Sequence, residues 1–234
     1  PKRSRLMVIL LLSKLGTGVV WTKNHPLFGL DLSSAVGGLT GLTGEGMIGK
    51  RRKCLMSHVL ILVGSVRRNG NTQALAQACA EGARAAGHQV EIVSVADYHV
   101  HPCIGCEGCS QHPENQCVQQ DDMQKIYPKL LWADVVAAAS PVYFYGVSAQ
   151  LKAIIDRCHT PLRNQFHIQK LALLLVGGAT LPTLFDAILC QYQMILDYFR
   201  LSDGGRVLVS GVRAPGEIAG HPELQAAYAL GKNL

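Results

Sequence analysis

A continuous apolar run at residues 58–64 (HVLILVG) constrains the fold more than any other feature of this chain. The run has the length of a strand and shows no alternation of polar and apolar residues, which is typical of a strand covered on both faces. A polar turn and an Ala-rich helical pattern over residues 72–86 follow directly, and Gly87 marks the end of that helix. The region therefore opens with a strand, a loop and a helix of the kind that builds a parallel sheet.

The same alternation of strand and helix continues to the end of the sequence. Further strands are predicted at residues 89–95, 134–140, 171–176 and 206–212, and further helices at residues 122–132, 148–159, 184–199 and 222–230. Five such units in about 180 residues indicate the smaller doubly wound α/β fold. We expect a five-stranded parallel sheet in the order 2-1-3-4-5, with helices on both faces, formed by residues 56–234 as one domain.

Residues 1–55 differ from this domain in charge and pattern. They carry nine of the 22 Lys and Arg residues and two of the 16 acidic residues, a net charge of +7, which leaves the rest of the chain at −1. The apolar run at residues 6–12 is far too short to span a bilayer, which needs about 20 apolar residues. We expect an N-terminal extension that is unstructured or non-native, ahead of a domain that begins near Met56; a targeting or membrane-surface segment is the alternative. The near-neutral domain lacks the basic surface of a nucleic-acid-binding protein.

The loop after the first strand has the composition of a phosphate site. In doubly wound sheets, ligands bind beyond the carboxyl ends of the strands, where such loops meet. Residues 65–72 (SVRRNGNT) combine small polar side chains, an arginine and the start of a helix, which together suit a phosphate monoester. The chain has neither a dinucleotide-binding glycine motif nor a Walker loop. An ordinary polar turn is the alternative.

The loops after the third and fourth strands offer groups of another kind. Residues 140–146 (SPVYFYG) place three aromatic side chains in a row, which suit a stacking wall for a flat ring, although Phe144 fits core packing equally well. Gly177 and Gly178 allow a ligand to approach the backbone closely, or they form a simple turn. A flat, phosphate-bearing ligand at this edge of the sheet is one interpretation of the three loops, and ordinary turns with core packing are the other.

Four cysteines lie between the second strand and the next helix: Cys103, Cys106, Cys109 and Cys117. The C-x2-C-x2-C spacing aims each sulfur toward a common point, which is a ligand pattern of iron–sulfur clusters, and the fourth ligand often comes from further along. A tetrahedral zinc site would use the same sulfurs, and reduced thiols without a metal are the third interpretation. Eight cysteines without the pattern of a small secreted domain indicate a reducing compartment, and we expect a cytoplasmic protein.

Four segments resemble the NADPH-dependent FMN reductase-like branch of the flavodoxin-fold proteins, and more narrowly the iron–sulfur flavoproteins. These segments are GSVRRNGNT at 64–72, PCIGCEGC with a later cysteine and DDM within 102–123, SPVYFYGVSAQLKAIIDR at 140–157, and VGG at 176–178. They occur in the family's order, and the resemblance spans residues 56 to about 215. It implies a flavodoxin-like fold and an FMN-dependent oxidoreductase driven by NAD(P)H or by a reduced carrier.

The resemblance also implies roles for individual residues. The FMN phosphate would be held by Ser65, Arg67, Asn69, Gly70, Asn71 and Thr72. The isoalloxazine would be flanked by Pro141, Val142, Tyr143, Phe144, Gly146, Gly177 and Gly178. Cys103, Cys106, Cys109 and Cys117 would hold a [4Fe–4S] cluster that exchanges electrons with FMN. No side chain is expected to act as a catalytic acid or base, because the flavin carries the electrons.

The expected partners are small molecules and redox proteins. They are a nicotinamide or ferredoxin-type electron donor and an acceptor such as a quinone or a flavin, with no nucleic acid and no membrane span. A homodimer or homotetramer is expected by analogy with reductases that carry a long loop. Two other functions remain open: a flavodoxin-type electron carrier without catalytic turnover, and a redox- or metal-sensing module. Access of a nicotinamide to the flavin separates the reductase from the carrier.

Overall fold

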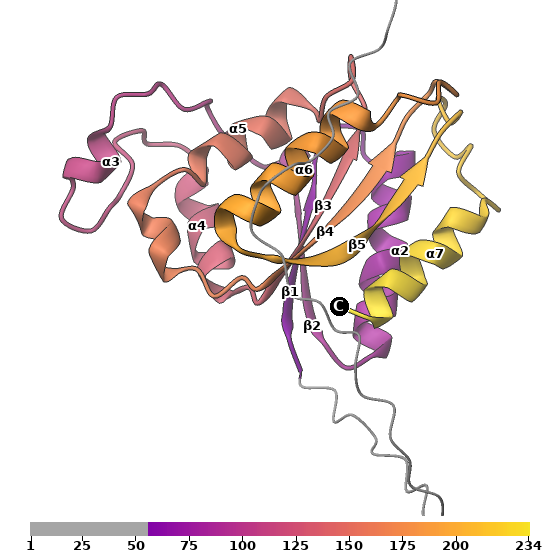
Figure 1. Ribbon diagram of the computed structural model, residues 1–234, viewed down its shortest axis with the longest axis horizontal. Helices are drawn as coiled ribbons and strands as arrows, with labels where there is room; N and C mark the ends of the chain where they lie inside the picture. Colours follow the sequence, from indigo (N-terminus) through magenta and orange to yellow (C-terminus); the bar gives the residue numbers. More distant parts are fainter. Residues whose placement is uncertain (1–55) are drawn as a thin grey trace, which may run out of the picture. The chain divides into compact units, whose positions relative to one another are not determined.

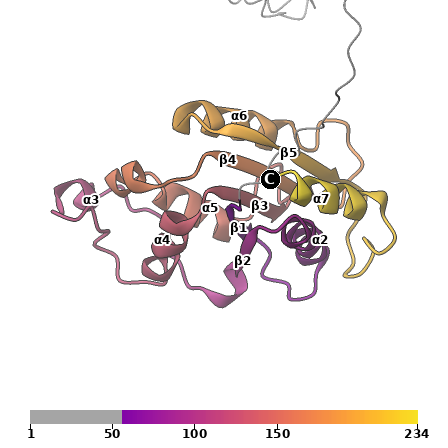
Figure 2. The same ribbon diagram turned by 90° about the horizontal axis from the view of Figure 1, so that it is seen from below.

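The computed structural model describes residues 56–234, and the predicted extension at residues 1–55 lies outside the described residues. The described part has three layers, in which one sheet separates two layers of helices (Figure 1). Helices α2 (Asn71–Ala85) and α7 (Pro222–Lys232) cover one face, and the other face is covered by α4 (Met123–Trp132), α5 (Ala149–Arg157) and α6 (Asp186–Phe199). Figure 2 shows α6 and α2 on opposite sides of the strands.

Five strands form the sheet, and all neighbouring pairs are parallel. In their order across the sheet they are β2 (Gln89–Ser94), β1 (His58–Val63), β3 (Val135–Pro141), β4 (Lys170–Val176) and β5 (Ser202–Val209). This confirms the predicted fold class and the strand order 2-1-3-4-5. The apolar run explains why β1 takes an inner place, because five of its six residues are buried.

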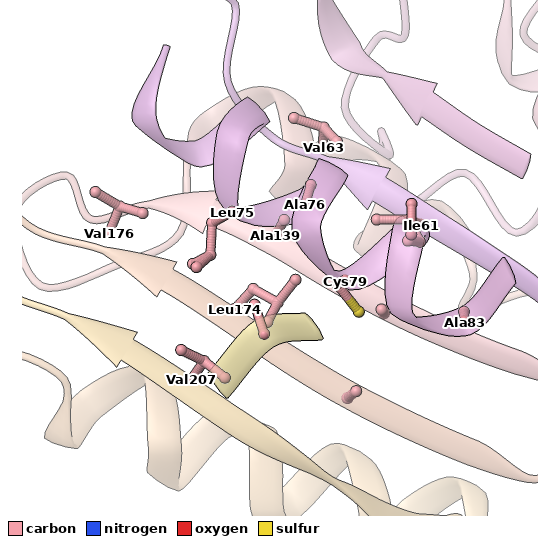
Figure 3. Close-up of a cluster of buried hydrophobic side chains, with 14 of the residues drawn as sticks. Ile61, Val63, Leu75, Ala76, Cys79, Ala83, Ala139, Leu174, Val176 and Val207 are labelled. Atoms are coloured by element: carbon pink, nitrogen blue, oxygen red, sulfur yellow. The ribbon is translucent and has the colours of Figure 1, made fainter. Parts of the chain in front are cut away.

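Each face of the sheet has its own hydrophobic core. On one face, Leu75 and Cys79 of α2 lie over the sheet near Leu174 of β4 (Figure 3). Helices α2 and α7 approach so closely that a Cβ added to Gly82 would lie 1.9 Å from the backbone oxygen of Tyr228. This tight packing fixes α2 on the sheet, and with it the place where its N-terminus meets the loop after β1.

Most helices lie within a few residues of their predicted bounds, and none within residues 56–234 is long and apolar enough to cross a membrane. The last strand was predicted at residues 206–212, but β5 runs from Ser202 to Val209. Pairing of Ser202 with Lys170 outweighs the turn-forming sequence Ser-Asp-Gly-Gly, and a bulge absorbs the irregular register. Three short helical segments were not predicted: α3 (Gly108–Gln111) and the 3₁₀ turns Val95–Asp97 and Pro161–Gln165.

Candidate functional site

A crevice lies at the carboxyl edge of the sheet. Strands β1 and β3 are neighbours, but the helices that follow them, α2 and α5, lie on opposite faces. The two loops therefore diverge, which is the position at which ligands bind in folds of this type. A pocket with a volume of ≈ 260 Å³ opens there, and its lining comes from the loops after β1, β3, β4 and β5.

The pocket brings together most of the residues predicted to hold the flavin. Nine of them line it: Ser65, Arg67, Gly70, Asn71, Thr72, Pro141, Val142, Tyr143 and Gly178. Four others do not line it but adjoin or hydrogen-bond to residues that do: Asn69, Phe144, Gly146 and Gly177. The sequence prediction missed Val176, Val212, Arg213 and Pro215. Three of these follow β5, and their place over the pocket depends on where that strand ends.

The start of α2 forms one end of the pocket. Ser65 and Thr72 are 5% and 3% exposed, and Ser65 Oγ accepts a hydrogen bond of 3.2 Å from the N–H of Arg67. Gly70 is the N-cap of α2 and offers no side chain to cap the helix, so the N–H groups of the first turn remain available. Such donors, with the positive end of the helix dipole, suit a phosphate group.

Asn71 has a structural task that the sequence did not reveal. Its side-chain amide donates to the backbone oxygen of Ala214 at 2.8 Å. Its Oδ1 accepts from the N–H groups of Gly216 and Ile218 at 3.0 and 3.4 Å. The side chain therefore fastens the segment after β5 to the start of α2, and an anion in the cradle would meet the backbone of Asn71 rather than its amide.

Two arginines make the pocket electropositive. Arg67 and Arg213 both line it, and no Asp or Glu of residues 56–234 does. Arg213 Nε donates to the backbone oxygen of Gly178 at 2.9 Å, and a Cβ on Gly178 would lie 2.6 Å from Cγ of this arginine. The N–H groups of Arg213 and Ala214 donate to the carboxylate of Glu217 at 2.6 and 2.9 Å, which lowers the pKa of Glu217. The segment after β5 is thus folded so that its arginine lies across the β4 loop.

The aromatic segment after β3 is a tight two-residue turn. Tyr143 and Gly146 exchange backbone hydrogen bonds of 2.9 and 3.0 Å, and the two residues between them have positive φ, 48° for Phe144 and 64° for Tyr145. This pattern is that of a type I′ turn, which Asn and Gly adopt with little strain and aromatic residues do not. Phe144 is 98% exposed, so core packing does not impose the strain. The turn presents an aromatic surface at the rim of the pocket.

The cysteine loop, which we define as residues 103–117, does not line the pocket. Two of its cysteines are exposed and two are partly buried. The loop contains α3, which lies at one end of the described structure (Figure 1). Within residues 56–234, no three His, Cys, Asp or Glu side chains are arranged to bind a metal ion. The four thiols fit a cluster in their chemistry, but the loop would have to draw them together.

A second cavity of ≈ 180 Å³ lies between α5, α6 and the sheet. Its lining is almost wholly apolar, with core residues such as Leu151 and Ile188, and it includes Cys158. Burial raises the pKa of the Cys158 thiol to about 12, so this cysteine stays protonated. None of the predicted flavin or metal residues lines this cavity, and we assign the ligand site to the polar pocket instead.

Comparison with known proteins finds similarity to flavin-dependent reductases. The profile of the NADPH-dependent FMN reductases matches residues 57–201. An iron–sulfur flavoprotein of Archaeoglobus fulgidus is 35% identical over 178 residues, 74% of this chain and 76% of the relative. One from Methanocaldococcus jannaschii is 40% identical over 121 residues, 52% of this chain and 59% of the relative, so this chain spans about three fifths of that relative. Among solved structures, the NAD(P)H:quinone oxidoreductase from Methanothermobacter marburgensis has a TM-score of 0.62 at 19% identity, covering 76% of this chain and 98% of that chain.

Proposed function

The chain belongs to the NADPH-dependent FMN reductase family, and on that premise we propose that it is an FMN-dependent oxidoreductase. It would take electrons from NAD(P)H and pass them to a small-molecule acceptor. The observation that most directly supports this proposal is that one pocket combines an anion cradle at the start of α2 with an aromatic turn after β3. FMN has the two matching parts, a phosphate and a flat ring. FMN supplies hydride acceptance and one-electron release, and the protein has to bind, orient and shield it.

The phosphate would lie at the start of α2. Ser65 and Thr72 offer hydroxyl groups, and residues 69–72 offer backbone N–H groups at the positive end of the helix. Arg67 would add a charge-assisted hydrogen bond, which is about twice as strong as a neutral one. A dianionic phosphate is favoured in this cradle because none of the carboxylates in the part of the chain that the structure describes lines the pocket.

The ring would lie between the loops after β3 and β4. Pro141, Val142 and Tyr143 offer apolar and aromatic surface on one side, and Gly178, whose lack of a side chain makes room for Arg213, lines the other. Arg213, held on the Gly178 carbonyl, adds a second positive charge that attracts an anionic cofactor. Phe144 and Tyr145 extend the aromatic surface outward.

The four cysteines of the cysteine loop are proposed to hold a [4Fe–4S] cluster that exchanges electrons with FMN. The proposal is supported by the spacing of the thiols and by the relatives of 35% and 40% identity that are called iron–sulfur flavoproteins. Anaerobic reconstitution should give about four iron and four sulfide per chain, the composition of that cluster type. Stoichiometric zinc would indicate a structural metal instead, and no metal at all would leave an FMN reductase with idle thiols.

The partners follow from the same proposal. We propose a nicotinamide or ferredoxin-type donor, a quinone or flavin as acceptor, a homodimer or homotetramer, and a cytoplasmic setting. The named activity of the structural neighbour, an NAD(P)H:quinone oxidoreductase, motivates the choice of a quinone as the first acceptor to test. A flavodoxin-type carrier is the second candidate, because it would need the same FMN pocket.

Affinity for FMN and riboflavin tests the pocket. Because riboflavin lacks the phosphate, it should bind far more weakly than FMN in isothermal titration. Arg67→Ala should weaken FMN binding about 10- to 100-fold, as expected for loss of a charged hydrogen bond of about 1.5–3 kcal/mol, and should leave riboflavin binding unchanged. Arg84→Ala, at the other end of α2, is the matched control. Equal affinities for FMN and riboflavin would remove the phosphate assignment.

Anaerobic mixing with NADPH or NADH separates the reductase from the carrier. A reductase should bleach the visible absorbance of the flavin within its turnover time and regain it when a quinone is added. Flavin that is reduced by dithionite but not by either nucleotide would instead support the carrier.

A further inference from the structure

The cysteine loop is closed by a neck, which we define as residues 99–102 together with residues 119–122. Two aspartates on one side bind the backbone on the other: the N–H of His99 donates to Asp122 Oδ2 at 2.8 Å, and the N–H of His101 donates to Asp121 Oδ2 at 2.8 Å. All four predicted ligands therefore lie in one loop whose two ends are joined. None of the neck residues lines the flavin pocket.

Arg157, the last residue of α5, joins the neck to the body of the domain. Its Nη1 and Nη2 donate to the two carboxylate oxygens of Asp121 at 2.8 and 3.2 Å, and Nη1 also donates to the backbone oxygen of His101 at 3.0 Å. The side chains of Arg157 and Asp121 are 1% and 2% exposed. One buried guanidinium thus binds both sides of the neck at once.

This buried pair is an unusual way to stabilise a fold. Apolar side chains of similar volume often stabilise a core as well as a buried ion pair does, because both charges of the pair lose their hydration. A forked guanidinium, however, fixes the angle and register of what it binds. The Nε–H of Arg157 is also buried and has no hydrogen-bond partner among residues 56–234. Burial lowers the pKa of Arg157, but the Asp121 carboxylate that it binds helps to hold that pKa above its ordinary value.

We propose that Arg157 is a positioning residue for the cysteine loop: by closing the neck, it holds the two ends of the loop in the register that metal binding by the four thiols requires. The proposal rests on the proposed role of the four cysteines as ligands. It assigns to Arg157 no contact with FMN, because the pair lies outside the pocket. Residues that do not bind the metal themselves but orient the residues that do are a general feature of metal sites in proteins.

The double variant Arg157→Met/Asp121→Leu tests this in the full chain. It replaces the buried pair by apolar side chains, so the fold should persist while the hydrogen bonds to the neck are lost. The matched control is Lys152→Met/Asp156→Leu, which removes an ion pair from the same helix whose side chains are both 41% exposed. Arg157→Lys keeps the charge but loses the fork. Each protein is assayed for FMN content, melting temperature, protease cleavage within the cysteine loop, thiol reactivity without metal, and iron bound after anaerobic addition of ferrous iron and sulfide.

The double variant should keep its FMN and its melting temperature, lose most of its iron, and show several-fold faster cleavage and thiol reaction in the cysteine loop. Arg157→Lys should recover part of the iron binding, and the control should match the wild type. Wild-type iron content or wild-type protease resistance in the double variant would overturn the proposal. Loss of FMN together with iron would also overturn it, because the pair would then support the whole fold. If the wild type binds no iron, the cluster proposal fails, and cleavage and thiol reactivity still decide whether Arg157 positions the loop.

Discussion

The strained turn after β3 should be relieved by residues that its backbone favours. Phe144→Asn/Tyr145→Gly keeps the two backbone hydrogen bonds between Tyr143 and Gly146, and it places at the positive-φ positions residues that adopt them readily. We expect a protein that is more stable and yet works less well with its flavin or substrate. Strain held at a functional site commonly shows this trade-off.

The gain in stability can be estimated from the geometry of the turn. Each L-residue in the left-handed region costs about 1–2 kcal/mol, and two such residues are relieved. Glycine returns about 0.5–1 kcal/mol of this through the entropy of the unfolded chain. Phe144 contributes almost no burial at 98% exposure, and its edge contact with Tyr145, at 5.9 Å between ring centroids, is a small loss. The net gain is about 1–3 kcal/mol, which raises the melting temperature of a domain of this size by about 2–12 °C.

Thermal unfolding followed by circular dichroism, with FMN titration and NADPH-driven flavin reduction, would measure both effects. Tyr198→Asn is the control, because Tyr198 is an exposed aromatic residue, 55% exposed, inside α6, where asparagine is a poorer helix former and should lower the melting temperature. A melting temperature of the turn variant at or below that of the wild type would refute the strain. Unchanged flavin binding and reduction would refute the functional role of the aromatic turn.

The sheet was predictable because its signals are local. The apolar run of β1 and the alternation of strands with helices fix a parallel sheet, and such a sheet gathers its loops at one edge. Ser65 and Thr72 therefore line one pocket with Tyr143, although more than 65 residues separate the two loops in sequence. The rule that ligands bind beyond the carboxyl ends of the strands therefore predicts the site wherever the strands themselves are correctly identified.

The contacts of the site were less predictable because they depend on distant backbone groups. Asn71 reads as one more polar residue of a phosphate loop, yet its amide is bound to a segment 143–147 residues away. Arg213 was missed because the sequence analysis assigns only the loops after the first, third and fourth strands to the site, whereas the segment after β5 also lines the pocket. Arg157 reads as the charged end of an amphipathic helix, and only the folded chain shows it buried. A sequence pattern shows that a side chain is polar, but it does not show what that side chain binds.

Three further outcomes are expected. Burial raises the pKa of Asp121, but hydrogen bonds, chiefly from Arg157, hold this pKa below its ordinary value of 3.8. The ionised Asp121 therefore contributes fully to stability above about pH 4, and this contribution is lost as the pH falls through the folded-state pKa. The urea midpoint should consequently fall more steeply below pH 4 in the wild type than in Asp121→Asn. A chain that begins at Met56 should match the full chain in FMN content and melting temperature, because residues 56–234 contain the complete sheet and pocket, and an insoluble or FMN-free product would contradict this.

Asn71 and Thr72 are adjacent, but they should fail in different ways. Asn71→Ala leaves the N–H groups and oxygen of the segment after β5 without partners, so it should lower the unfolding free energy by about 1–3 kcal/mol and expose that segment to protease. Thr72→Ala removes a hydroxyl from the cradle, so it should weaken FMN binding and leave the urea midpoint nearly unchanged. If the two variants lose stability and FMN affinity in the same proportion, the division between a fastening residue and a ligand-binding residue is wrong.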